Sequence, residues 1–236
     1  MRPRRGDRSR QHPAARARAS ARAPVAAVLI ALSSTAAATA AEQPQVQLTK
    51  AGQAAARAAG IIRDDVGRKA AWSGGAIRPD PSAQDDCPAY HPRRADLVLN
   101  GIAGTAYENR ASGVSLRSQT IVFRARRMVR LFEQRSLLAP TLLPCVARQT
   151  AATLPETLRY VSIQHIAFPI VGSFTTAWRI TLELRATGER VAIDQIGFAR
   201  GRTEVNLAAT YFVRDAAAVR PAEGRLALAI AQRIRV

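Results

Sequence analysis

The sequence predicts an α+β domain, in which helices flank an antiparallel β-sheet of about five or six strands with a C-terminal meander. Three observations lead to this prediction: alternating apolar residues in the second half of the chain, short turns between these segments, and stretches with apolar residues at helical spacing. The connections in the second half are too short for the crossovers that parallel strands require. The strands there must therefore pair in antiparallel fashion.

The first elements expected after residue 41 are a helix and a loop. Thr49 is a favourable N-cap for a helix that runs to about Ile62 through a segment dense in strong helix formers. Residues 73–95 contain two adjacent glycines and four prolines. We expect a surface loop without regular structure there.

Strands and helices follow in the middle of the chain. Strands are expected from residue 97 onward and over 114–123, where Val, Ile and Thr are frequent. In the segment 124–138, apolar residues from Ala125 to Phe132 fall at i, i+3, i+4 and i+7, which predicts an amphipathic helix. A further short helix carrying Cys145 should begin after Pro140.

Four strands and a last helix complete the prediction. A strand over 158–168 ends at a proline, which cannot donate to a ladder. The strict alternation over 177–186 indicates a strand with one buried and one solvated face. Asp194 lies in the next strand, 191–199, and is expected to face outward. The last strand spans 203–213, and Pro221 is expected in the first turn of the final helix.

The first 41 residues resemble an export segment. Eight arginines and one aspartate give residues 1–22 a formal charge of +7, and an apolar run of about eight residues and the cleavage-type sequence Ala38-Thr39-Ala40 follow. That run is well short of the roughly 20 residues of a membrane span, so cleavage is favoured over retention as an anchor. The domains expected are the export segment 1–41, the helix and loop of 42–95, and the α+β domain 96–236, onto which 49–95 packs.

Two cysteines remain after the export segment. In an oxidising compartment, Cys87 and Cys145 are expected to form one disulfide, with a pair of buried thiols as the alternative. No histidine lies at zinc-ligand spacing from either, and the adjacent carboxylates Asp64-Asp65 and Asp85-Asp86 lack the alternating oxygen ligands of a cation loop. We expect neither a metal nor a cofactor.

The sequence contains no arrangement typical of a catalytic centre. His165 and Asp194, with a nearby serine, suggest a hydrolase, but no nucleophile-elbow motif is present. The simpler explanation is that His165 is an ordinary sheet residue. A secreted hydrolase that uses His165 with a carboxylate stays as one alternative function.

Arginines cluster around the helix predicted over 124–138. Candidate anion-binding residues there are Arg124, Arg126, Arg127 and Arg130, although a solvated helix face is the simpler explanation. The remaining chain carries a formal charge of about +11, so an electrostatic binder of anionic envelope polymers or lipid head groups is a second alternative. Nucleic acid binding is not favoured, because aromatic residues make up only 5% of the chain.

Four features follow one another along the chain: Cys87 before a strand, the run 114–123 leading into an amphipathic helix, Leu143-Pro144-Cys145, and the segment Gly197 to Arg202 before a final helix. This order resembles the secreted sensor-like domains of actinobacteria, which include extracellular domains of receptor serine/threonine kinases and related cell-envelope lipoproteins. It implies a central sheet, a cleft between sheet and helices, and binding or sensing without catalysis. No kinase domain, spanning helix or acylated cysteine accompanies it.

The function expected from the sequence is an exported, non-catalytic ligand-binding or interaction domain of the bacterial cell envelope. Its partner would be a small ligand or an anionic envelope component, and we expect a monomer. The ligand would enter between the sheet and the helix 124–138, where apolar lining and a few cations would coexist.

Overall fold

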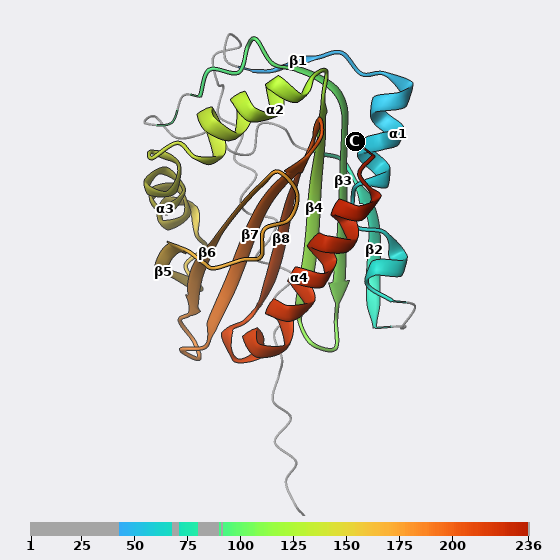
Figure 1. Ribbon diagram of the computed structural model, residues 1–236. Helices are drawn as coiled ribbons and strands as arrows, with labels where there is room; N and C mark the ends of the chain where they lie inside the picture. Colours follow the sequence, from blue (N-terminus) through green and yellow to red (C-terminus); the bar gives the residue numbers. More distant parts are fainter. Residues whose placement is uncertain (1–42, 68–70, 80–89, 91, 236) are drawn as a thin grey trace, which may run out of the picture.

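The computed structural model describes residues 43–67, 71–79, 90 and 92–235 (Figure 1). The predicted export segment and Cys87 lie outside these residues. Within the described part of the chain, no helix combines the length and the apolar character needed to cross a membrane.

One mixed, mostly antiparallel sheet forms the centre of the fold. Strands β5 to β8 form an antiparallel meander, β8 pairs with β4, and β4 forms a hairpin with β3. The other edge of β3 pairs with β2 in antiparallel and with β1 in parallel orientation. The strands of the described residues are β1 Gln45–Val46, β2 Trp72–Ile77, β3 Val98–Asn109, β4 Val114–Phe123, β5 Leu158–His165, β6 Phe174–Leu184, β7 Arg190–Arg200 and β8 Thr203–Phe212.

Helices cover both faces of this sheet. The helix α4 (Ala216–Arg233) runs along one face together with the end of α1 (Lys50–Ala58), and α2 (Arg126–Phe132) and α3 (Leu142–Thr153) lie on the other. α2 continues into a wider π-helical turn, Glu133–Leu137. The predicted α+β class and C-terminal meander are confirmed.

The alternation of side chains along each strand decides which helix they meet. On β8, Val205 and Leu207 belong to the apolar cluster that includes Ile230 of α4. Glu204 and Asn206 of the same strand point to the opposite face, towards α2 and α3. Each central strand therefore contributes to two separate layers of the molecule.

Two glycines allow α1 to lie directly on β3. A Cβ at Gly52 would be 2.1 Å from the carbonyl oxygen of Asn100, and a Cβ at Gly101 would be 2.1 Å from the carbonyl oxygen of Gly52. The helix begins as predicted, because the Thr49 hydroxyl accepts a hydrogen bond from the Gly52 amide at 3.0 Å. Thr49 caps the helix at the point where it meets the sheet.

The prediction of irregular structure over 73–95 is wrong at its beginning, where β2 pairs with β3. The number of strands is also higher than expected, because β1 and β2 were not predicted. Gly74 has a φ of +137°, and a Cβ there would be 2.1 Å from the carbonyl oxygen of Ala106. Gly74, which indicated a loop, instead permits a close strand contact.

The expectation of a solvated face on the C-terminal strands is wrong in the centre of the sheet. Asp194, expected to face outward, is fully buried and paired with Arg179. Alternation reveals that a strand has two faces, but it does not reveal that helices cover both.

The ends of two other elements differ from the prediction. The strand expected over 158–168 stops at His165. α4 begins at Ala216, so Pro221 lies inside the helix and not in its first turn. Because proline has no amide hydrogen, one intrahelical hydrogen bond is missing there.

Candidate functional site

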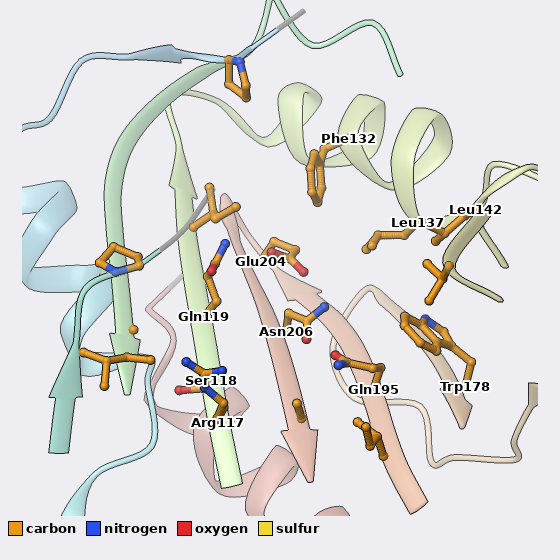
Figure 2. Close-up of a pocket in the computed structure, with 18 of the residues that line it drawn as sticks. Arg117, Ser118, Gln119, Phe132, Leu137, Leu142, Trp178, Gln195, Glu204 and Asn206 are labelled. Atoms are coloured by element: carbon orange, nitrogen blue, oxygen red, sulfur yellow. The ribbon is translucent and has the colours of Figure 1, made fainter. Parts of the chain in front are cut away.

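A cavity of about 280 Å³ lies between the sheet and the layer formed by α2 and α3. Figure 2 shows its floor, formed by strands β4, β8 and β7, and its cover, formed by the helical side chains Phe132, Leu137 and Leu142. This is the region where the sequence analysis expected a ligand to enter.

The floor of the cavity carries a row of polar side chains. Gln119 of β4 lies directly opposite Asn206 of β8. Two residues away along the strands, Arg117 of β4 and Gln195 of β7 both lie opposite Ala208. In the other direction, Glu204 of β8 lies opposite Ile121. Residues directly opposite in a ladder share a face, so all five polar side chains point to the cavity side.

The walls of the cavity are mostly apolar. Phe132 and Leu137 come from α2 and its π-helical turn, Leu142 and Val146 from α3, and Trp178 from β6. Other apolar contributors to the lining are Ile77, Pro79, Leu99, Ile121, Phe123, Ile180, Ile193 and Ala208. Apolar walls around a few converging polar groups are characteristic of small-molecule sites.

None of the five polar side chains on the floor is hydrogen-bonded through its side chain to another described residue. Gln119, Gln195 and Asn206 are half-buried, Arg117 is exposed, and Glu204 is only 2% exposed. Polar side chains that are withdrawn from solvent usually have hydrogen-bond partners. The cavity floor therefore offers hydrogen-bonding groups that the rest of the described chain does not use.

Two carboxyl groups near this floor have raised pKa values. Burial, and the nearby charge of Glu133, raise the pKa of Glu204 to about 8. Burial raises the pKa of Glu133 to about 7, against the opposing effect of the Arg130 charge. One carboxyl oxygen of Glu133, Oε1, is buried without a hydrogen-bond partner. Uncompensated burial disfavours the ionised form of both side chains.

The four candidate arginines of the sequence analysis do not line this cavity. Arg124, Arg126, Arg127 and Arg130 are all exposed on or next to α2. The same helix presents Phe132 to the cavity from its buried side. Anion binding by these arginines stays a prediction.

His165 and Asp194 do not form a catalytic pair. His165 lies opposite Trp178, on the cavity side of the sheet, whereas Asp194 lies opposite Arg179, on the α4 side. Asp194 accepts hydrogen bonds from the Arg179 guanidinium at 2.6 and 2.7 Å and from the Tyr211 hydroxyl at 2.8 Å. These hydrogen bonds hold the Asp194 carboxylate within the core.

Cys145 lies in α3 and is 1% exposed, within an apolar cluster that contains Tyr90 and Leu142. No cysteine among the described residues is a free thiol. Cys87, the partner expected for Cys145, lies outside the described residues, so the predicted pairing stays a prediction.

The cavity residues were missed because the sequence analysis assigned alternate polar residues of the strands to solvent. A usable signal was present: Gln119, Gln195 and Asn206 are uncharged polar residues at the middle of long β-strand patterns. The outer face of an ordinary sheet usually carries charged residues or threonine, and carboxamide side chains are less typical there. Their position near the middle of three paired strands indicates a shared polar patch.

The fold and the cavity define an α+β domain with a partly open space between its sheet and two of its helices. No protein-family model matches this chain, and no curated protein matches it in sequence. Among solved structures, the extracellular domain of PknH from Mycobacterium tuberculosis is similar over 58% of this chain, with a TM-score of 0.37 and 11% identity. This chain spans 64% of the length of that domain.

A second similar structure is PA94, a protein of unknown function from Pseudomonas aeruginosa. It matches 50% of this chain and 81% of its own, with a TM-score of 0.25 and 12% identity. These two likenesses assign the chain to no family.

Proposed function

We propose that this protein is an exported, non-catalytic ligand-binding domain of the bacterial cell envelope, which holds a small polar molecule between its sheet and the α2–α3 layer. The observation that carries the proposal is the row of five polar side chains on the cavity floor, whose side chains have no hydrogen-bond partner among the described residues. A ligand would supply the missing hydrogen bonds.

The size of the cavity supports a small ligand. Its volume of about 280 Å³ is near the lower end of the range of roughly 300–1,000 Å³ found for small-molecule sites. The apolar walls would contribute to affinity, and the polar floor would fix the orientation of the ligand.

Binding and not catalysis is proposed because the one acid/base pair suggested by the sequence is separated by the sheet. His165 and Asp194 lie on opposite faces, and Asp194 is held by Arg179 and Tyr211. A hydrolase built on this pair has no geometric support.

A screen of small polar compounds by ligand-observed NMR tests this function, with Asn206→Leu as the site variant. The leucine would remove a polar group from the floor and fill space, so we expect compounds that bind the wild type to bind the variant at least about tenfold more weakly. The matched control is Asn100→Leu on β3, a half-buried asparagine outside the cavity lining. Unchanged binding by Asn206→Leu, or a screen without any binder, would refute the proposal.

The proposed location rests on the export segment 1–41. We expect the native protein to be recovered outside the cytoplasm, cleaved after Ala40, with Cys87 and Cys145 linked. Mass spectrometry of the secreted, non-reduced protein measures both features at once. An intact amino terminus in a cytosolic fraction, with both thiols reduced, is the result that contradicts this location.

A second candidate function is electrostatic attachment to an anionic surface through α2. Arg124, Arg126, Arg127 and Arg130 are exposed and make no ion pair with another described residue. Vesicles containing phosphatidylglycerol provide the probe, and binding should weaken strongly between low and moderate salt. Replacement of all four arginines by glutamine should abolish it, and salt-independent binding would exclude this function.

A further inference from the structure

The polar row on the cavity floor has opposite charges at its two ends. Glu204 lies opposite Ile121 on β4, and Arg117 is four residues away along that same strand. At about 3.3 Å per residue, this places the two positions about 13 Å apart. The carboxamides of Gln119 and Asn206, which lie opposite each other, occupy the space between them.

At the other end of the row, Glu204 has no ion-pair partner among the described residues. On the neighbouring strands it faces Ile121 of β4 and Ala199 of β7, and from the helical layer the charge of Glu133 raises its pKa further. Among the described residues, no arginine forms an ion pair with Glu204 or shifts its pKa, although the buried Arg94 also lines the cavity and Arg130 partly offsets the charge of Glu133. A cationic group placed here would compensate a buried carboxylate, which is where an ion pair has its largest effect.

The Arg117 end is open and positive. Arg117 is exposed, makes no ion pair with a described residue, and lines the cavity together with the exposed Arg78, which follows β2. Guanidinium groups bind carboxylates and phosphates through two parallel hydrogen bonds. This end is therefore suited to the anionic part of a ligand.

Building on the proposed function, we propose that the ligand is a small zwitterion, whose ammonium group binds Glu204 and whose anionic group binds Arg117. Gln119 and Asn206 would hydrogen-bond its polar middle part, and Phe132 and Trp178 would cover its apolar part. A simple amine would leave Arg117 unused, and a simple anion would face the carboxylates of Glu204 and Glu133.

This assignment couples binding to proton release. The ammonium group requires the ionised form of Glu204, whose pKa lies at about 8 in the empty cavity. Below that pH, binding must expel a proton from Glu204, so affinity should rise as pH increases from about 6 to about 8.5. It should fall again only when the ligand amine itself loses its proton near its own pKa of about 10.

The experiment is isothermal titration calorimetry of the whole secreted protein with three matched probe series: ω-amino acids, alkylamines and alkyl carboxylates, each of four to eight carbons. We expect an ω-amino acid to bind at least about tenfold more tightly than the amine and the carboxylate of the same length. Measurements at about pH 6.5 in buffers of different ionisation enthalpy should show that protons are released on binding.

Two isosteric variants assign the ends. Glu204→Gln should weaken the ω-amino acid at least about tenfold and abolish proton release, and Arg117→Gln should weaken the ω-amino acid but leave the alkylamine unchanged. Arg110→Gln, at an exposed position after β3 and outside the cavity lining, is the control that should change neither. Because glutamine fits the Glu204 position without a charge, the first variant should fold at least as stably as the wild type.

Three results would overturn the proposal. Equal binding of the carboxylates and the ω-amino acids would show an anion site, and an unchanged affinity in Glu204→Gln would show that no ammonium group binds there. If no ω-amino acid binds while other compounds bind in a manner that depends on Asn206, the ligand class is wrong and the proposed function stands. If no compound binds at all, the proposed function fails as well.

Discussion

The polar side chains on the two faces of the central sheet differ in their hydrogen bonding. On the α4 side, Arg179, Asp194 and Tyr211 form a closed set of hydrogen bonds. On the α2–α3 side, the polar side chains of the same strands find no partner among the described residues. The difference separates polar residues that stabilise the fold from polar residues that are available to a ligand.

Further contacts on the α4 side follow the same pattern. The Ser118 hydroxyl accepts from the Ile61 amide at 3.0 Å, and the Thr120 hydroxyl donates to the Ala59 carbonyl at 3.2 Å. Glu223 of α4 is the exception, since neither of its carboxyl oxygens has a partner. Burial and the charge of the nearby Asp194 carboxylate raise the pKa of Glu223 to about 8, because both disfavour its ionised form.

The largest effect on stability is expected from a substitution that disrupts the hydrogen bonds among Arg179, Asp194 and Tyr211. Arg179→Met should lower the free energy of unfolding by about 3–5 kcal/mol, because it leaves the Asp194 carboxylate buried without its cation. Urea unfolding measures the loss. The matched control is Arg159→Met, which removes an exposed ion pair with Glu183 and should cost about 1 kcal/mol or less. Equal losses in both variants would contradict the distinction.

A smaller effect is expected from pH. The folded-state pKa values of Glu133, Glu204 and Glu223 are raised to about 7, 8 and 8, above the value of 4.5 of an unperturbed glutamate. The folded state therefore binds protons more tightly than the unfolded chain, and the stability that these groups contribute is fully present below about pH 4.5 and lost as pH rises to about 8. Urea unfolding between about pH 5 and 9 should show this decline.

The same titration distinguishes one of the three groups. Glu204→Gln has no carboxyl at this position, so its stability should fall less steeply with pH than that of the wild type. The variant should be at least as stable as the wild type above pH 8, where the buried charge is otherwise fully formed. A steeper decline in the variant would show that the Glu204 carboxylate is stabilised in the folded state and not destabilised.

The smallest effect on stability is expected on the cavity floor. Gln195→Leu and Asn206→Leu remove polar groups that make no side-chain hydrogen bond within the described part of the chain, so each should change the free energy of unfolding by no more than about 0.5 kcal/mol in either direction. Chemical denaturation measures this directly. A loss of about 2 kcal/mol or more in either variant would mean that these side chains support the fold.

The sequence predicted much of the fold because most elements follow local rules. The boundaries of β4 match the prediction, and those of β8 match within one residue, since their alternation is uninterrupted. The helix of 124–138 was found from its spacing. β2 was not predicted because Gly74 is typical of a turn, and only the structure shows that its backbone lies close to Ala106 of β3.

The site was harder to predict than the fold because it depends on contacts between distant segments. The expected position of the cleft, between the sheet and the helix of 124–138, agrees with the cavity. The residues that line the cavity could not be predicted, because the alternation of side chains along a strand defines its two faces without indicating which face a helix covers. The clustering of positive charge instead led to the prediction that the exposed arginines of α2 bind an anion.

NMR of the side-chain amide groups tests the central claim most directly. In a titration with a ligand obtained from the screen, the side-chain NH₂ resonances of Gln119, Gln195 and Asn206 should shift together and saturate, while the backbone amide signals of α4 should stay unchanged. Saturating shifts on α4, with these three carboxamides unaffected, would contradict the assignment of the cavity floor to a ligand.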